Sequence, residues 1–382
     1  MATGSREFQV FAKPVGARCN LACSYCYYLP KSRLSGGDGK VCMAEDLLET
    51  YIIQHIEACT DSVIRFSWHG GEPALLGLAG FQSIVALQKK HCPDHQTIAN
   101  GIQTNGTLLN EAWCRFLADE GFSVGISLDG PEAMHDYYRK TREGKPTYAQ
   151  VLNAYRGLQE HGVVTEILCV VSAHNARYPA DVYSFFQELD VHYITFLPLV
   201  EAQTNSPTGV SDRTVAPNAW GDFLCTVFDL WQAHDIGRIR VQIFEEAART
   251  AFNQGHTLCI FREVCGGVPV LEYNGDVYSC DHYVNPQHRL GNIRERSLAE
   301  LLDSSAQKAF GQAKWDTLPN TCRNCAVRVM CNGGCPRNRL VRTSANEPGL
   351  NYLCSGYKRF FTHCLPFINA LGAAWRAQSA GD

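Results

Sequence analysis

Three cysteines near the N-terminus are the residues of this chain best suited to redox chemistry. Cys19, Cys23 and Cys26 lie in the run RCNLACSYCYYLPK, with three residues between the first two and two between the last two. Three thiolates of one loop can bind three irons of a cubane cluster and leave the fourth iron open to another ligand. The alternatives are a zinc loop or a cluster used only for electron transfer, but zinc sites more often combine two distant cysteine pairs.

A second group of eight cysteines lies in the C-terminal half, at positions 259, 265, 280, 322, 325, 331, 335 and 354. Eight thiolates are enough for two fully ligated 4Fe-4S clusters, and a zinc ribbon or a pair of zinc sites is the structural alternative. The remaining seven stand singly in patterned segments, where cysteine is usually a small buried apolar residue. We assign no chemistry to Cys42, Cys59, Cys92, Cys114, Cys169, Cys225 and Cys364.

The composition indicates a globular protein of the size of a barrel domain plus a smaller one, with 382 residues of which 45% are hydrophobic. A net charge of -4 gives no extended basic surface, so we expect neither nucleic acid nor a membrane as partner. No run of eighteen apolar residues occurs, and the start MATGSREFQV lacks a signal-peptide core. We therefore expect a cytoplasmic protein whose cysteines bind metals rather than form disulfides.

Short β-rich runs alternate with segments of helical period between residue 8 and about residue 200. This rhythm favours a parallel sheet, as either an open doubly wound sheet or a partial barrel. The segments GGEP, QTNG and SLDGP each follow the carboxyl end of a strand, where parallel α/β folds bind ligands. The expected strands are 8–15, 63–68, 98–104, 122–127, 166–171 and 192–197, and the expected helices lie near 44–58, 80–91, 110–120, 147–161 and 179–189.

The second half of the chain follows a different pattern. Residues 202–218 are rich in Pro, Gly, Ser and Thr and predict a loop, and a helix is expected over 220–234. The turn NGD between 268–273 and 277–280 predicts a β-hairpin, and the tail from 355 to 378 has a helical pattern.

An ordered set of motifs resembles a known enzyme family. The cysteine loop, with Tyr25 before Cys26, resembles the signature of the radical SAM superfamily, in which S-adenosylmethionine (SAM) binds the open iron through its amino and carboxylate groups. The wider chain resembles the anaerobic sulfatase-maturating enzymes over nearly its whole length. The motifs that carry this resemblance are CNLACSYCYYLPK, FSWHGGEP, IQTNGTLL, SLDGP followed by HDYYR, LCVVS, FLPLVE, GDVYSCDHYV, RLGNI and CNGGCPRNR followed by LNYLC.

The resemblance implies an α/β fold: a partial (β/α)6 TIM-like barrel with its linker over residues 1–235, then a Cys-rich SPASM domain over residues 236–382. The SPASM domain would hold two auxiliary [4Fe-4S] clusters and end in a helix. By matching motifs, one cluster takes Cys259, Cys265, Cys280 and Cys335, and the other takes Cys322, Cys325, Cys331 and Cys354. Spacing alone allows other pairings. Full ligation by the protein points to electron transfer as the role of both auxiliary clusters.

The resemblance also assigns the contacts to SAM and to a peptide substrate. Gly70, Gly71 and Glu72 match the segment that binds the methionyl amino group, although a plain Gly-Pro turn is the local alternative. Ser127 and Arg139 match the ribose and carboxylate contacts, with Arg142 as the rival for the carboxylate. Tyr25 and Tyr28 offer aromatic surface to adenine or substrate, or simple packing. His69, which stands where some members carry glutamine, and Gln103 are candidate contacts to the peptide.

The implied reaction oxidises a cysteine or serine in the active-site motif of a sulfatase to Cα-formylglycine. A 5′-deoxyadenosyl radical removes a Cβ hydrogen. Loss of one more electron and of the proton on oxygen or sulfur then gives an aldehyde from serine or a thioaldehyde from cysteine, and water hydrolyses the thioaldehyde to the aldehyde. Asp281, directly after Cys280, matches the catalytic aspartate that would accept the proton. The local alternatives are a hydrogen-bond partner of the groups around a cluster or a turn cap. The expected cofactors are SAM and three [4Fe-4S] clusters.

The expected partners are an unfolded or nascent sulfatase polypeptide as substrate and a flavodoxin or ferredoxin as reductant. Two other functions compete with this prediction. One is a different SPASM peptide modifier that makes a thioether, an epimerised residue or a crosslink. Such enzymes often carry an added leader-binding domain, whereas the first strand is expected here by about Phe8. The other is a non-catalytic iron-sulfur electron carrier.

Overall fold

A computed structural model describes residues 8–31 and 42–379 and divides into two compact units. Unit 1 comprises Met1–Ser127, Asp136–Thr165 and Gly266–Gly311, and unit 2 comprises Leu128–His135, Glu166–Cys265 and Gln312–Asp382. Both units are discontinuous in sequence, and a linear domain boundary near residue 235 stays a prediction. Among the described residues, no helix has both the length and the apolar character needed to cross a membrane.

Unit 1 contains seven named strands of a sheet. In spatial order they are β10 (Arg289–Asn292), β9 (Asp276–Tyr278), β8 (Val270–Glu272), β1 (Phe11–Lys13), β2 (Val63–Trp68), β3 (Thr97–Thr104) and β4 (Ser123–Ser127). The strands from β8 to β4 run parallel, whereas β8, β9 and β10 pair in antiparallel order, so the predicted NGD hairpin is confirmed. Strand β1 is shorter than predicted because Pro14 has no N–H to pair with a neighbour.

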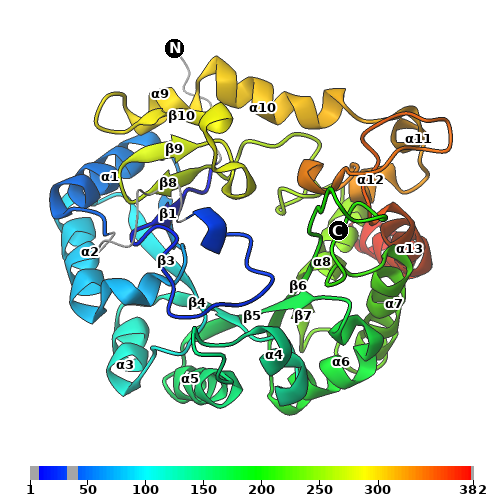
Figure 1. Cartoon of the computed structure of the whole chain (residues 1–382), viewed down its shortest axis with the longest axis horizontal. Coiled ribbons are helices and arrows are strands. Elements are labelled where there is room, and N and C mark those ends of the chain that lie inside the picture. The colour runs from blue at the N-terminus through cyan, green and yellow to red at the C-terminus, as the bar shows by residue number, and fades with distance from the viewer. Residues whose placement is uncertain (1–7, 32–41, 380–382) are drawn as a thin grey trace. The chain divides into compact units, whose positions relative to one another are not determined.

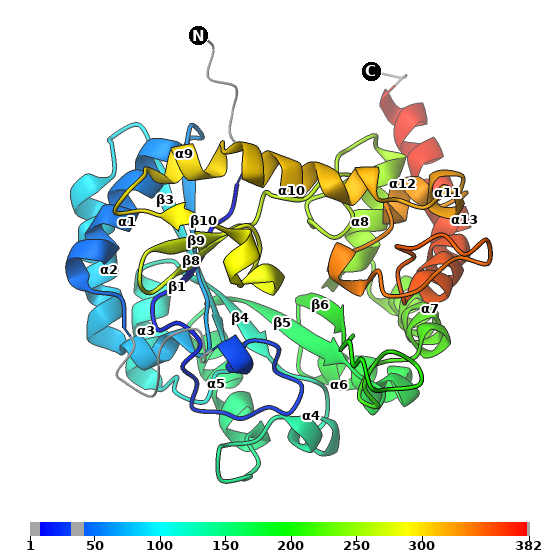
Figure 2. The same cartoon turned by 45° about the horizontal axis from the view of Figure 1, so that its top comes forward.

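The helices of unit 1 follow the strands closely, as the alternating pattern predicts. Figure 1 shows α1, α2, α3 and α5 along the outer side of β1 to β4, and Figure 2 shows α9 beside the hairpin. Each buries one apolar face; α1, for example, buries Leu48, Ile52 and Ile56. The bounds are α1 (Glu45–Ala58), α2 (Leu78–His91), α3 (Glu111–Asp119), α5 (Tyr148–Glu160) and α9 (Leu298–Leu302), with short 3-10 turns at Pro73–Leu76, Asp281–Tyr283 and Pro286–His288.

The parallel register places the carboxyl ends of four strands at one edge of the sheet. Ala12 pairs with Trp68, Trp68 with Ile102, and Thr104 with Ile126, so β1 to β4 end close together. The segments that follow these ends are the cysteine loop, GGEP, the TNG turn and the start of SLDGP. The sequence prediction that these motifs share one edge is therefore confirmed for unit 1.

Unit 2 contains the parallel strands β5, β6 and β7 and most of the remaining helices. Residues of α4 (Glu132–Tyr138), β5 (Val164–Val171) and α10 (Ser305–Asp316) are divided between the two units. The helices α8 and α10 were not predicted from the sequence. The other bounds are β6 (Tyr193–Pro198), β7 (Arg240–Val241), α6 (Pro179–Glu188), α7 (Pro217–His234), α8 (Gln242–Ala251), α11 (Asn320–Arg323), α12 (Arg328–Cys331) and α13 (Cys354–Ser379), with 3-10 turns at Asn175–Arg177 and Pro336–Asn338.

Two glycines allow α7 and α13 to cross at very short range in unit 2 (Figure 1). A Cβ atom on Gly356 would lie 2.2 Å from the carbonyl oxygen of Pro217, and one on Gly221 would lie 2.9 Å from the Cα of Gly356. Only a residue without a side chain fits at either position. Because Cys354 begins α13 two residues before this crossing, the packing of the two helices also fixes the place of that thiol.

We expect Gly356→Ala to destabilise unit 2 by about 1–3 kcal/mol, since the added methyl group must push α13 away from α7. The iron content after anaerobic reconstitution should also fall, because Cys354 moves with the helix. Denaturant unfolding and iron analysis measure the two effects. The neighbouring exposed change Ser355→Ala is the control and should stay within about 0.5 kcal/mol of wild type. Wild-type stability of Gly356→Ala would contradict the close crossing.

Candidate active site

The cysteine loop is held in place by backbone hydrogen bonds within unit 1. The N–H groups of Ala22 and Ser24 donate to the carbonyls of Lys140 and Tyr138, at 2.9 and 3.3 Å. The N–H of Cys26 donates to the carbonyl of Cys23 at 3.0 Å, which closes a turn inside the loop. These backbone hydrogen bonds hold the loop that presents the three thiols.

The three thiols of this loop lie close enough to affect each other's charge. Burial raises the pKa of Cys19 to about 12; a hydrogen bond from the Leu21 N–H opposes this rise, and the charges of Glu72, Cys23 and Cys26 add to it. Cys19 therefore becomes a thiolate readily only when cations compensate its charge, as the irons of a cluster do. Among the described residues, no three His, Cys, Asp or Glu side chains converge closely enough to hold a single metal ion. The thiolates of a cubane are spread over several irons and stand further apart.

The buried carboxylate of Glu72 joins three segments of the sheet edge. Its Oε1 accepts hydrogen bonds from the Thr104 hydroxyl at 2.7 Å and the Ala74 N–H at 3.0 Å, and its Oε2 accepts from the Asn105 N–H at 2.7 Å. The Asn105 side chain in turn donates to Asn20 at 3.0 Å and reaches the Cys19 sulfur at 3.7 Å. Burial raises the pKa of Glu72, and these three donors oppose the rise. Glu72 thus links the GGEP segment, the TNG turn and the cysteine loop.

The glycines before Glu72 lie directly against the start of the cysteine loop. The N–H groups of Gly71 and Glu72 donate to the carbonyls of Gly16 and Arg18, at 2.8 and 2.9 Å. A Cβ atom on Gly71 would lie 2.1 Å from the carbonyl oxygen of Arg18, so a side chain here would push the two segments apart. The requirement for glycine is therefore steric, and it keeps the cysteine loop in contact with the strand edge.

The two candidate arginines have different surroundings. Arg142 is exposed, and its Nε and Nη2 donate to the carbonyl of Cys19 at 3.1 and 2.9 Å. Arg139 is buried, with its guanidinium carbon 5.5 Å from the centre of the Tyr25 ring. Gln103 donates to the Ser127 hydroxyl at 3.3 Å, so these two candidates are also neighbours. Arg142 is thus already bound to the backbone of the cysteine loop.

A buried group of charged and aromatic side chains surrounds Asp281. Lys13, only 2% exposed at the end of β1, places its Nζ 2.6 Å from the Asp281 Oδ1 and 4.0 Å from the centre of the Tyr28 ring. The Tyr27 hydroxyl donates to Asp281, and the Tyr28 hydroxyl donates to Glu272, which pairs with Lys13 in the sheet register. One lysine thus serves two buried carboxylates, with two tyrosines of the cysteine loop as further donors.

The charges of this group follow from its contacts. Burial would raise the pKa of Asp281, but the Lys13 ammonium, His282 and the Tyr27 hydroxyl hold it well below its usual value. Burial raises the pKa of Glu272, and the hydrogen bond from the Tyr28 hydroxyl and the charge of Lys13 oppose the rise. Burial and Lys13 lower the pKa of His69 to about 3, with Asp281 opposing, so its ring is neutral at pH 7 and stacks on Phe11 at 3.8 Å between ring centres.

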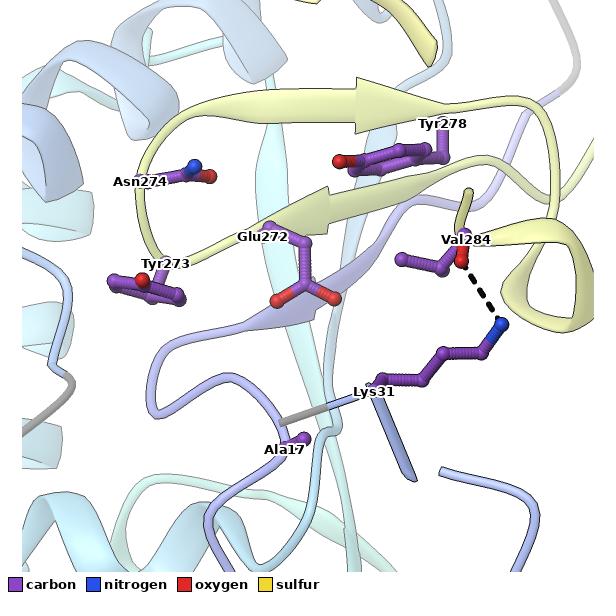
Figure 3. A pocket seen from close by; sticks show the side chains of 7 residues that line it. All are labelled: Ala17, Lys31, Glu272, Tyr273, Asn274, Tyr278 and Val284. Carbon is purple, nitrogen blue, oxygen red and sulfur yellow. Dashed lines mark hydrogen bonds between the residues drawn. The ribbon is translucent and has the colours of Figure 1, made fainter. Parts of the chain in front are cut away.

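A small cavity of about 20 Å³ lies beside Glu272, between the hairpin and the end of the cysteine loop (Figure 3). The Lys31 ammonium donates to the Val284 carbonyl at 2.9 Å across one side of it. This volume holds about one water molecule, which is too little for a substrate. Ala17, Tyr273, Asn274 and Tyr278 complete its wall.

The C-terminal cysteines of unit 2 fall into two sets by their effects on each other. The charges of Cys354, Cys322 and Cys325 all raise the pKa of Cys331, after the larger effect of burial. Cys335 and Cys265 act in the same way on Cys259, again after burial. These neighbours match the two ligand sets implied by the motifs, and Cys280, the fourth member of the Cys259 set, belongs to unit 1.

Comparisons with known proteins agree with this arrangement. Residues 14–185 match the model of the radical SAM superfamily, and residues 264–326 match that of the iron-sulfur cluster-binding SPASM domain. A serine-type anaerobic sulfatase-maturating enzyme of Bacteroides thetaiotaomicron is 42% identical, over 96% of this chain and 91% of that protein. A cysteine-type enzyme of Clostridium perfringens is 32% identical, over 93% and 95%. The chain belongs to the family of anaerobic sulfatase-maturating enzymes.

A solved structure shows the same fold for a member of the family. Native anSMEcpe with bound AdoMet and Cp18Cys peptide matches with a TM-score of 0.87 at 30% identity, over 96% of this chain and 99% of that chain. The predicted fold class, a partial barrel with a SPASM domain, is confirmed. The family also fixes the cofactors of this enzyme as SAM with a [4Fe-4S] cluster and further clusters in the SPASM domain.

Three residues of the Asp281 group were missed in the sequence analysis of this family member: Lys13, Tyr27 and Glu272. Lys13 and Glu272 are charged residues in short strands that are otherwise apolar, and this contrast was the available signal. Tyr27 stands between two tyrosines that were both assigned roles, and no local pattern distinguishes it.

Glu72→Gln tests the link between the segments at the sheet edge. The glutamine amide has one acceptor oxygen where the carboxylate has two, so its N–H groups must face at least one of the three groups that donate to Glu72. We expect the free energy of unfolding to fall by about 1–3 kcal/mol. Denaturant unfolding of the metal-free chain at pH 8 measures this effect. Glu120→Gln, which removes an exposed ion pair with Lys89, is the control and should change stability by less than about 1 kcal/mol. Equal effects of both changes would refute the role of Glu72.

Proposed function

We propose that this enzyme oxidises a serine or cysteine in the active-site motif of a sulfatase to Cα-formylglycine, and that serine is among its substrates. Family membership supports the reaction. The identity of 42% to a serine-type enzyme, against 32% to a cysteine-type one, favours serine. The observation that carries the proposal is the ion pair of Asp281 with Lys13 beside the tyrosines of the cysteine loop.

The cysteine loop has the first part in this reaction. We propose that Cys19, Cys23 and Cys26 hold the cluster that binds SAM, and that the bound cofactors supply a radical that abstracts hydrogen and an acceptor for one electron. Arg142 and Asn105 keep the loop in place through the Cys19 carbonyl and sulfur. The remaining residues at the sheet edge then orient SAM and the peptide.

The proposed contacts to SAM follow the motifs and the surroundings of each residue. The carboxylate of Glu72 accepts from three protein donors, so we assign the methionyl amino group chiefly to the carbonyls of Gly70 and Gly71. Arg139, which is buried beside Tyr25 of the cysteine loop, pairs with the carboxylate of SAM, and the exposed Arg142 holds the Cys19 carbonyl. Ser127 binds the ribose, and Tyr25 and Tyr28 flank the adenine or the peptide.

The peptide contacts lie near Asp281. We assign Asp281 as the acceptor of the proton that leaves the substrate side chain, with Lys13 and the Tyr27 hydroxyl orienting its carboxylate. His69 is neutral and half-buried beside Phe11, so it offers a hydrogen bond without a charge. Gln103, next to Ser127, is the proposed contact to the peptide backbone.

The auxiliary clusters and partners complete the proposal. Cys259, Cys265, Cys280 and Cys335 bind one auxiliary cluster, and Cys322, Cys325, Cys331 and Cys354 bind the other. A flavodoxin or ferredoxin supplies electrons, the substrate is an unfolded or nascent sulfatase segment, and the reaction takes place in the cytoplasm. The chain divides near residue 235 into a radical SAM part and a SPASM part.

Mass spectrometry of a sulfatase-motif peptide tests the function. We expect anaerobic incubation with SAM and a reductant to remove two hydrogens from the serine peptide, in step with release of 5′-deoxyadenosine. The cysteine version of the peptide should yield the same formylglycine product. An alanine version of the peptide is the control and should remain unchanged. Deoxyadenosine release with a thioether or crosslinked product would instead show a different peptide modifier.

Asp281→Asn tests the proposed proton acceptor. We expect wild-type iron content and deoxyadenosine release, with formylglycine formation reduced by about 10²-fold or more, the usual contribution of a general base. The matched control is Asp276→Asn, which removes a carboxylate of β9 that pairs with Arg289 of β10. This change should leave turnover unchanged. Wild-type formylglycine yield in Asp281→Asn would exclude this role.

A further inference from the structure

Lys314 is a buried cation that the proposed reaction does not use. It lies on α10, is 1% exposed, and its Nζ donates to the carbonyls of Cys259 and Ile260 at 2.9 Å each and to that of Arg262. Burying an ammonium group is costly unless nearby groups compensate its charge. Burial lowers the pKa of Lys314, and the charges that oppose this most are those of the thiols of Cys265, Cys259 and Cys335.

Arg339 is a second cation of unit 2 that the proposed reaction does not use, and it is half-buried. Its guanidinium donates to the carbonyls of Asn332 and Gly333, at 3.4 and 3.3 Å, in the loop between Cys331 and Cys335. It also donates to the Lys314 carbonyl at 2.7 Å. A Cβ atom on Gly333 would lie 2.9 Å from the Arg339 Nη2, so the loop folds directly onto the guanidinium.

The two cations differ in the cysteines that they face. The thiols that act on Lys314 all belong to the Cys259 set. Burial lowers the pKa of Arg339, and it is opposed by thiols of both sets, namely Cys322 and Cys331 of one and Cys265 and Cys335 of the other. The hydrogen bonds agree with this division, because Lys314 binds the Cys259 segment and Arg339 binds the loop that connects the two sets.

A fixed cation beside a cluster favours its reduced form. A [4Fe-4S] cluster with four thiolates gains one negative charge when it accepts one electron, and no bond is made or broken. In a buried site a nearby positive charge stabilises that added charge more than it would in water, and local charge is among the factors that set cluster potentials. Neither lysine nor arginine needs to move or release a proton for this effect.

We propose that Lys314 and Arg339 raise the reduction potentials of the two auxiliary clusters, with Lys314 acting on the cluster of the Cys259 set and Arg339 acting on both. This inference rests on the proposed assignment of the cysteines. It goes beyond the proposed reaction, because it names the residues that make the auxiliary clusters able to accept the electron removed from the substrate. Both are positioning residues that contact no substrate.

The test uses the full chain, reconstituted anaerobically, and a redox titration followed by electron paramagnetic resonance. In Lys314→Gln, which keeps hydrogen-bond donors but removes the charge, the ratio of oxidised to reduced form of one auxiliary cluster at a fixed potential should rise about tenfold, or about 59 mV for one electron. Arg339→Gln should shift both auxiliary clusters in the same direction. Arg339→Lys keeps the charge and should restore most of the wild-type potential.

The N-terminal cluster is an internal control, since its potential should stay unchanged in every variant. Lys308→Gln, an exposed lysine on the same helix, should leave all potentials as in wild type. Full iron content with unshifted potentials in Lys314→Gln and Arg339→Gln would refute this inference alone. If Arg339→Gln loses iron, the inference is judged by the potential of the auxiliary cluster in Lys314→Gln compared with that in the wild type. Iron for fewer than three clusters in the wild type would refute the cysteine assignment as well, whereas a failure to form formylglycine would leave the measured potentials intact.

Discussion

The buried carboxylate of Glu72 is the interaction on which the rest of the active site depends. Its two oxygens bind donors from the segment after β2 and the turn after β3, and Asn105 carries that link on to Asn20 and Cys19. The absence of side chains at Gly70 and Gly71 lets the backbone at residues 16–18 lie directly against this carboxylate's own segment. The cysteine loop is therefore held against the edge of the sheet by these contacts.

Each unit, taken by itself, places a fixed cation near groups that can carry negative charge. In unit 1 the ammonium of Lys13 pairs with the carboxylate of Asp281 and keeps it ionised although it is buried, and Lys13 lies opposite Glu272 in the sheet register. In unit 2 the cations of Lys314 and Arg339 face thiols rather than carboxylates. Lys314 and Arg339 donate hydrogen bonds to backbone carbonyls, and these bonds hold the two charges in fixed positions. Such fixed charges suit reactions in which electrons and protons leave separately.

Much of the fold and of the site could be predicted from the sequence, because both depend on short local patterns. Strand β2 has the predicted bounds, and the motifs after β1 to β4 share one edge because parallel strands allow no other arrangement. The roles of Lys13, Tyr27 and Glu272 could not be predicted, since they arise from pairing between β1 and β8, more than 250 residues apart. The same limit applies to Lys314 and Arg339, whose function depends on which cysteines surround them.

The most direct test of the account is whether SAM binds the cluster of the cysteine loop. Electron paramagnetic resonance of the reduced, reconstituted enzyme with and without SAM measures this. We predict that SAM alters the signal of one cluster only, and that this response disappears in the triple variant Cys19→Ala, Cys23→Ala, Cys26→Ala while the iron of two clusters remains. An identical spectrum with and without SAM, or a fourth protein ligand on that cluster, would contradict the central claim.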